Sequence, residues 1–312
     1  MTLILSHLSK LVVIQASDRL TTQNGNEFDR EANKTLVLIA PDGVASVSFC
    51  GLALFKNEPA DIYLAKSLIG EIPDFFGRVP NMGPCLCNKM RKIDDMLFAI
   101  QATAENAMKN SFTARRSAFG LSICGWRIRN GREEPFALNM MKGVGKSKLS
   151  ILEKTPRRWT NFQQVYVSHL PANYIKAEGE KKIIEASKKK YKTFDESCDA
   201  WRDCFVDLIR LSAKKTRLVG MDAMIVVLPP PSIKKIAIRH VPIAMQHVSW
   251  KFAQNVPIAY SPWIIGQKNF YAPSVLSGNK FQHFVDDTEI IFHAPQNKSG
   301  VTYIGTYHRR II

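Results

Sequence analysis

The sequence predicts an α+β protein built as a four-layer αββα sandwich, with a β-rich extension at the C-terminal end. Three observations favour this fold class. Two pairs of strand-like segments open the chain, helical apolar spacing occupies residues 89–109 and 197–214, and a buried closing strand follows the second of these segments. Two stacked sheets need a helical cover on each outer face, and this order of elements supplies both covers.

The opening strand pairs are recognisable from alternating or continuous runs of β-branched and apolar residues. The first pair covers residues 3–8 and 11–17, and the second covers 35–40 and 44–50. The second pair is separated by Pro41-Asp42-Gly43, a combination that tight turns favour. We therefore expect two consecutive hairpins at the start of the fold.

The remaining elements alternate between helices and strands. Between residues 89 and 109, apolar side chains recur every three or four positions, which is typical of the buried face of a helix. The dipeptide Asn130-Gly131 is a strong hairpin signal between two further strands. The expected segments are helices at 62–69, 89–109 and 197–214, and strands at 118–129, 134–140, 163–168 and within 219–228.

A domain boundary is expected near residue 230. Residues 1–230 hold all the elements of the sandwich, and Pro229-Pro230-Pro231 forms a stiff break after the closing strand. Residues 231–312 are rich in aromatic and β-branched residues with Pro and Gly between them, as in 260–278. We expect this segment to form a β-rich extension packed on the first domain.

Composition excludes several classes of protein. The chain has 312 residues, of which 46% are hydrophobic and 22% charged, so it can bury a sizeable core. No apolar run approaches the roughly 20 residues of a membrane helix, and six scattered cysteines suit a reducing compartment, so we expect a cytoplasmic protein without a membrane partner. Cys85 and Cys87 lack a second ligand pair, and no phosphate-binding glycine loop is present. We expect no metal and no cofactor.

A net charge of +16 is the observation that favours a nucleic-acid partner. The basic runs Lys188–Lys192 and Lys214–Arg217 have the charge needed to bind phosphates. The first run lies close to Glu178, Glu180 and Glu185, however, as in a solvated helix, and no nucleic-acid-binding motif accompanies it. A basic nucleic-acid-associated protein is therefore the least favoured of our hypotheses.

Thr2 is the first candidate for a chemical role. A small residue behind the initiator Met1 allows an aminopeptidase to remove that Met, which leaves an α-amine and a hydroxyl on Thr2. Such an amine has a pKa of roughly 7.7–8.0, so it can accept the hydroxyl proton near neutral pH. Thr paired with its own N-terminal amine is an established form of activated nucleophile.

Three further residues follow Thr2 in a recognisable pattern. Asp18 lies in the corner Ala16–Arg19, Lys34 opens the next hairpin, and Gly51 lies in the small-residue turn Ser48–Ala53. This pattern resembles the start of proteasome β-type subunits and HslV-type peptidases, which are members of the N-terminal-nucleophile (Ntn) hydrolase superfamily. The motif-level resemblance is confined to roughly the first 55 residues.

The resemblance implies a role for each residue. Thr2 would be the nucleophile, Lys34 would keep the local field positive, and Asp18 would orient Lys34 and the α-amine. The N–H of Gly51 would hold the developing oxyanion. The chain would then be a threonine-type peptidase or amidohydrolase that cleaves peptide or amide bonds. Peptidases of the family form rings, which leaves a homo-oligomer open for this chain.

Two departures from the family pattern support an alternative. Lys215 and Leu218 stand where active members carry an Asp and a Ser before the closing strand, and no Ser–Gly pair follows the strand at 163–168. The alternative is a catalytically inactive Ntn-fold assembly or binding subunit. In that case Thr2 merely opens a strand, Asp18 accepts turn N–H groups, and Lys34 is a solvated residue.

Overall fold

Two large sheets account for most of the architecture. The computed structural model describes residues 2–23, 26–29, 32–70, 82–85, 91–111, 116–151, 157–160, 163–168, 178–189, 191, 194–231, 243–248, 258–277, 280–286, 288–293 and 303–306. Within these residues each large sheet contains eight strands. Part of the basic run at Lys188–Lys192, namely Lys190 and Lys192, lies outside the described residues.

The first sheet carries the N-terminal hairpin near its centre. Its strands in spatial order are β13 (Arg157–Thr160), β14 (Gln163–Ser168), β1 (Ile4–Leu8), β2 (Val13–Asp18), β15 (Ala223–Leu228), β16 (Ile243–Val248), β22 (Thr288–His293) and β21 (Lys280–Val285). β2 pairs antiparallel with β1 on one side and with β15 on the other. The register of the second pairing sets Asp18 opposite Ala223, so the turn before β15 ends beside Asp18.

The second sheet carries the second predicted hairpin. Its strands in spatial order are β12 (Ser150–Ile151), β11 (Arg132–Lys142), β10 (Phe119–Arg129), β6 (Gly43–Cys50), β5 (Thr35–Ala40), β18 (Trp263–Ile265), β19 (Asn269–Tyr271) and β9 (Met82–Pro84). β5 and β6 pair antiparallel across the turn that contains Asp42, and β10 continues the sheet antiparallel to β6.

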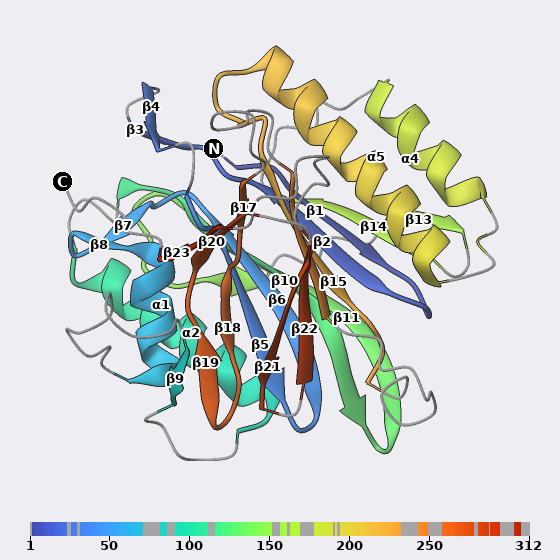
Figure 1. Cartoon of the computed structure of the whole chain (residues 1–312). Coiled ribbons are helices and arrows are strands. Elements are labelled where there is room, and N and C mark those ends of the chain that lie inside the picture. Colours follow the sequence, from blue (N-terminus) through green and yellow to red (C-terminus); the bar gives the residue numbers. More distant parts are fainter. Residues whose placement is uncertain are drawn as a thin grey trace.

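Helices cover the outer face of each sheet. α1 (Ala60–Ile69) and α2 (Ile93–Lys109) lie over the second sheet, and α4 (Glu178–Lys188) and α5 (Phe194–Lys215) lie over the first (Figure 1). The four-layer αββα sandwich predicted from the sequence is therefore confirmed. The layer that contains α4 is not evident from the sequence, because the mixed charge of this helix obscures the short apolar face that contains Ile183 and Ala186. No helix among the described residues is long and apolar enough to cross a membrane.

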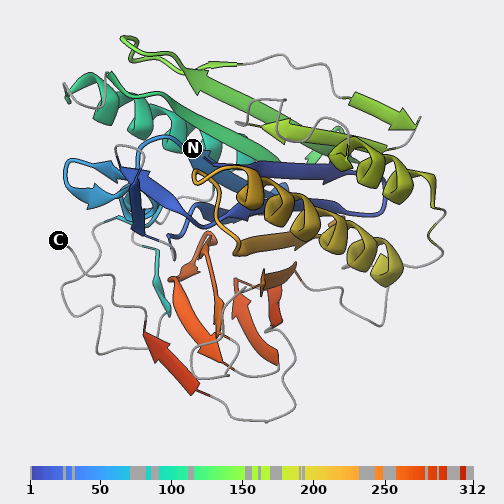
Figure 2. The same ribbon diagram turned by 90° about the horizontal axis from the view of Figure 1, so that it is seen from above.

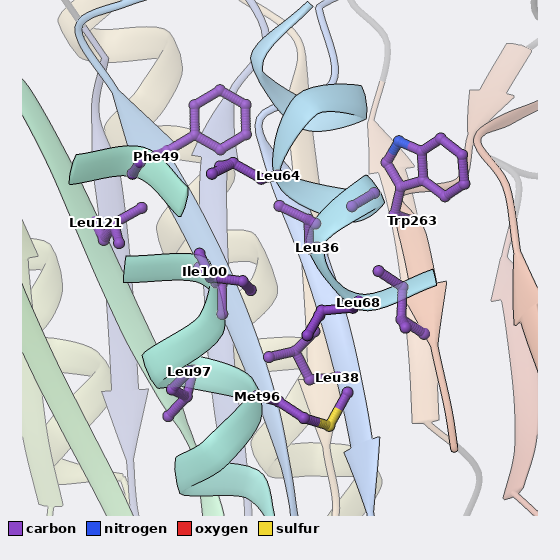
Figure 3. Packing of buried hydrophobic residues seen from close by; sticks show 14 of the residues in the cluster. Leu36, Leu38, Phe49, Leu64, Leu68, Met96, Leu97, Ile100, Leu121 and Trp263 are labelled. Atoms are coloured by element: carbon purple, nitrogen blue, oxygen red, sulfur yellow. The ribbon is translucent and has the colours of Figure 1, made fainter. Parts of the chain in front are cut away.

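The outer core of the second sheet explains why α1 and α2 are helical at these positions. Leu64 and Leu68 of α1 and Met96 and Ile100 of α2 have helical spacing, and all four point toward the sheet (Figure 3). They pack on alternate residues of the strands, such as Leu36 of β5. These side chains form one continuous apolar cluster between the helices and the sheet.

Strands from the last part of the chain extend both sheets on one side of the sandwich (Figure 2). β16 adds to β15 in the first sheet, and β18 adds parallel to β5 in the second. Ile264 of β18 and Ile290 of β22, the strand that pairs with β16, belong to the core between the sheets. The described residues after 231 thus mainly form strands, as expected for the β-rich C-terminal extension.

Three smaller sheets complete the described fold. β3 (Thr21–Gln23) pairs with β4 (Asn26–Asp29), β7 (Leu54–Phe55) pairs with β8 (Glu58–Pro59), and β17 (Ile258–Tyr260), β20 (Ser274–Ser277) and β23 (Tyr303–Thr306) form a three-stranded sheet. The β3–β4 hairpin directly follows the corner that contains Asp18. It therefore lies beside the candidate site described next.

Candidate active site

The residues singled out by the sequence meet at one end of the sandwich. Thr2 lies just before β1, Asp18 ends β2, Lys34 lies just before β5, and Gly51 follows β6. Thr2 and Asp18 thus come from the first sheet, whereas Lys34 and Gly51 come from the second. The site is assembled across the two sheets, so its geometry depends on how the sheets are placed relative to each other.

Asp18 is fully buried and saturated with hydrogen-bond donors. Its Oδ1 accepts the backbone N–H of Leu3 at 2.8 Å, and its Oδ2 accepts the backbone N–H groups of Leu20 and Gly220 at 3.1 Å each. The Lys34 ammonium lies 3.2 Å from the same Oδ2. A carboxylate needs this number of partners when it is withdrawn from water, because an unpaired buried charge is strongly destabilising.

Lys34 connects Asp18 to the hydroxyl of Thr2. Its Nζ donates to Thr2 Oγ1 at 2.9 Å, to Asp18 Oδ2 and to the backbone carbonyl of Leu20. An ammonium group has three N–H donors, and these three acceptors use all of them. The Thr2 oxygen therefore accepts from Lys34, which leaves its own proton available for transfer to another group.

Two opposing effects act on the charge of Lys34, and burial is the larger of them. Burial lowers the pKa of the Lys34 amine from its ordinary value, while the neighbouring carboxylate of Asp18 acts in the opposite direction. Both side chains are almost fully buried, at 3% and 0% exposed. An attraction between opposite charges is stronger in such a water-poor site than at the surface.

Gly51 occupies a position that only glycine fits. Its φ is +99°, and a Cβ at this position would lie 2.0 Å from the backbone oxygen of Ala118. Gly51 lines a small pocket together with Thr2 and Lys34, and the same pocket is bordered by Phe49. The turn therefore brings a backbone segment, without a side chain, beside the Thr2 hydroxyl.

Sequence reasoning missed several groups of the site. The Gly220 N–H, the Leu20 carbonyl and the Leu3 N–H are backbone groups, whose direction the residue types do not reveal. Cys50 also lines the pocket, and burial raises the pKa of its thiol to about 12, opposed by Lys34. The sequence signal that could have identified Cys50 is its place directly before Gly51 in the small-residue turn.

The two positions that depart from the family pattern contribute no polar side chain to the described site. Lys215 is the last residue of α5 and is exposed, and Leu218 is half-buried. Among the described residues, the side-chain hydrogen bond of Thr2 is the one from Lys34. Within the same residues, no group of three His, Cys, Asp or Glu side chains is arranged to hold a metal.

Comparisons with known proteins give similarities in structure only. No family model and no curated protein matches the chain in sequence. The structure is similar to that of the Anbu complex from Pseudomonas aeruginosa, solved as a helical assembly, at 15% identity over 81% of this chain and 89% of that chain, with a TM-score of 0.49. It is also similar to eukaryotic HslV from Trypanosoma brucei, at 15% identity over 73% of this chain and 99% of that chain, with a TM-score of 0.39.

A further similarity is to Anbu from Yersinia bercovieri, described as an ancestral beta-subunit, at 11% identity over 73% of this chain and 82% of that chain, with a TM-score of 0.45. Anbu and HslV are proteasome-like proteins with the Ntn fold, the group that the N-terminal residues of this chain resemble.

Proposed function

We propose that this protein is a proteasome-like N-terminal threonine hydrolase that cleaves peptide or amide bonds through Thr2 after removal of Met1. The observation that supports this proposal is the 2.9 Å hydrogen bond from Lys34 Nζ to Thr2 Oγ1, in a buried site anchored by Asp18. A hydroxyl placed against a buried cation has the electrostatic environment that a developing alkoxide requires.

The proposed reaction has two steps, and in each of them the α-amine of Thr2 accepts a proton and then gives it up. Thr2 Oγ1 attacks the substrate carbonyl carbon while its proton moves to the α-amine of the same residue. The C–N bond then breaks, the leaving amine takes this proton, and an ester joins the acyl group to Thr2. Water attacks the ester, losing its proton to the α-amine, and the Thr2 oxygen regains a proton as the carboxylic acid leaves.

Lys34 and Gly51 would stabilise negative charge during the reaction, and Asp18 would fix the orientation of Lys34. Lys34 uses its three N–H groups on acceptors already in place, so its proposed role is to stabilise negative charge on Thr2 Oγ1 and not to accept a proton. Asp18 holds Lys34 in position. Gly51 would provide its backbone N–H to the substrate oxyanion, in the pocket that it lines with Thr2.

Labelling with a peptide epoxyketone, followed by intact-mass measurement and N-terminal sequencing, tests the proposal. The wild-type protein from its own host should lack Met1 and gain the mass of one probe on Thr2. Thr2→Val keeps the shape of the side chain and should show no labelling of the folded protein, although its urea midpoint should fall because Lys34 loses one buried acceptor. Thr2→Ser keeps a hydroxyl and should be labelled at a reduced rate. Retention of Met1 would contradict the proposal directly.

A catalytically inactive Ntn-fold assembly or binding subunit is the second candidate. It is favoured by one observation, that Lys215 and Leu218 supply no polar side chain beside Thr2 in the described part of the chain. If this candidate is right, the wild-type protein will be folded, with a cooperative unfolding transition in urea, and will not be labelled. Labelling of Thr2 would exclude it.

Location, assembly and domain organisation complete the proposal. We propose a cytoplasmic enzyme that forms a homo-oligomer, with residues 1–230 as the Ntn-like domain and 231–312 as its extension. Light scattering on the full chain measures the assembly state, and limited proteolysis locates the boundary. Nucleic-acid binding remains the least favoured alternative, and a binding constant that does not fall with added salt would exclude it.

A further inference from the structure

A row of buried polar side chains crosses the space between the two sheets next to the site. We call it the polar strip: Ser6, Gln15 and Ser17 from the first sheet, and Thr35, Ser46, Ser48 and Ser122 from the second. Each of these residues is at most 2% exposed. None of them has a part in the chemistry proposed above, so their burial requires a separate explanation.

Gln15 is the centre of the strip. Its Oε1 accepts hydrogen bonds from Ser46 Oγ at 2.7 Å and Ser48 Oγ at 2.8 Å. Its Nε2 donates to Ser6 Oγ at 3.2 Å and to the backbone oxygen of Ser122 at 3.1 Å. One amide on β2 is therefore tied to both β6 and β10 of the opposite sheet.

A second connection lies at the base of the site itself. The hydroxyls of Ser17 and Thr35 are 3.1 Å apart, and Thr35 Oγ1 lies 2.9 Å from Ser48 Oγ. Ser17 immediately precedes Asp18, and Thr35 immediately follows Lys34. The hydrogen bond between the two hydroxyls thus joins the sheets one residue away from the ion pair that also joins them.

We infer that Gln15 and its hydroxyl partners are positioning residues that fix the first sheet against the second, and thereby hold the Thr2 hydroxyl opposite the Lys34 ammonium. Hydrogen bonds tolerate only a narrow range of distance and angle, whereas apolar contacts are non-directional. A site divided between two sheets needs such directional links, because an error of 1 Å in placement can cost about a hundredfold in rate. This inference rests on the proposed function of Thr2.

The decisive variant replaces the centre of the strip by apolar groups. Gln15→Leu alone would leave the hydroxyls of Ser46 and Ser48 buried without their acceptor. The triple variant Gln15→Leu/Ser46→Ala/Ser48→Ala removes the Oε1 acceptor together with its two hydroxyl donors, so the remaining cost is the donor lost by Ser6 Oγ and by the Ser122 backbone oxygen. If the strip only stabilises the fold, labelling of the folded triple variant will match the wild-type rate. If the strip positions the site, labelling of the folded triple variant will be slower by about tenfold to a hundredfold.

Val13→Ala is the matched control. Val13 lies on β2 two positions before Gln15, and it belongs to the apolar core between the sheets. Its truncation should lower the urea midpoint while the folded fraction is labelled at the wild-type rate. Slower labelling of the folded triple variant, together with an unchanged labelling rate in Val13→Ala, supports the inference. An unchanged rate in the triple variant overturns it.

A measurement independent of labelling separates this inference from the proposed function. In the triple variant, the pKa of the Lys34 amine, followed by NMR of ¹³C-labelled lysine, should move toward its ordinary value as water reaches the site. An unlabelled wild-type protein would end the proposal for Thr2, and an unchanged Lys34 titration would end the positioning inference. If the triple variant does not fold, the isosteric Thr35→Val variant decides the question by the same two measurements.

Discussion

The space between the two sheets is polar beside Thr2 and apolar further along the same strands. On β2, Ser17 and Gln15 take part in cross-sheet hydrogen bonds, whereas Val13 packs in an apolar cluster. On β5, Thr35 is followed two positions later by Val37, a member of the same cluster. Apolar contacts stabilise the fold but do not fix direction. The half that is joined by hydrogen bonds has less of this apolar stabilisation, and its contacts are directional.

Asp18→Ala breaks the polar half and should have the largest effect. The change leaves the buried Lys34 ammonium without its counter-charge, which alone costs roughly 3–5 kcal/mol. The backbone N–H groups of Leu3, Leu20 and Gly220 lose their acceptor as well. We expect the free energy of unfolding, measured in urea, to fall so far that little folded protein remains.

The control for Asp18 is an ion pair at the surface. Asp94 lies 3.1 Å from Arg129, and both side chains are about half exposed, at 54% and 52%. Asp94→Ala should change the free energy of unfolding by less than about 1 kcal/mol. Similar losses in the two variants would mean that Asp18 is not the anchor described here.

Trp126→Ala breaks the apolar half. Trp126 is 2% exposed, and its Nε1 donates to the backbone oxygen of Leu228 at 2.9 Å. A cavity of this size costs about 3 kcal/mol or more in the free energy of unfolding. Labelling of the folded fraction at Thr2 should nevertheless be unchanged, since the polar strip is intact. Trp126→Phe, which loses mainly the hydrogen bond, should cost about 1 kcal/mol.

Residue pattern was sufficient to predict the layers of the fold, and insufficient to predict the hydrogen bonds that join the two sheets. Apolar spacing in α2 and the hairpin signal at Asn130-Gly131 depend only on local sequence, so these elements were predicted within a few residues. Thr2, Asp18 and Lys34 were brought together as expected from the resemblance. Their catalytic roles remain predictions.

The polar strip could not be predicted, because its partners are far apart in the sequence. Gln15 and Ser46 belong to different sheets, and their contact depends on how the sheets are stacked. A lone Gln or Ser within a strand is equally compatible with a solvent-facing position. The Gly220 N–H was missed for a related reason, since only the pairing of β15 with β2 brings it to Asp18.

His7 provides a contrast to the satisfied polar strip, and its effect depends on pH. Its ring is fully buried against Trp201 at a centroid distance of 3.9 Å, and neither ring nitrogen has a hydrogen-bond partner among the described residues. Burial lowers the pKa of His7 from 6.5 to about 3. Between these values the unfolded chain binds the extra proton, so stability is lost as the pH falls below about 6.5.

The expected loss from His7 between pH 7 and pH 5 is about 2 kcal/mol in the free energy of unfolding. Urea unfolding at the two pH values measures it. His7→Phe keeps a ring against Trp201 and removes the titrating group, so the variant should lose about 2 kcal/mol less than the wild type over this interval. The same pH dependence in both proteins would show that His7 is not responsible.

The smallest effect compares two thiols at the two ends of the intersheet space. Burial raises the pKa of both Cys50 and Cys124 to about 12, so near neutral pH the thiolate fraction of each is roughly three orders of magnitude below that of an ordinary cysteine. Iodoacetamide should therefore modify Cys198, which is only partly buried, well before either of them. Peptide mapping of the native protein against a urea-unfolded control measures the three rates.

Because burial raises the pKa of Cys50 and of Cys124 to about the same value, a large difference between their rates reports local opening of the structure more than acidity. Cys50 borders the pocket over Thr2 and is 7% exposed, whereas Cys124 is 0% exposed in the apolar cluster. We expect Cys50 to react several-fold faster, since hydrogen bonds beside a pocket exchange with water more readily than packed apolar contacts open. Equal rates would mean that the two halves open together, and that the polar half is as rigid as the apolar one.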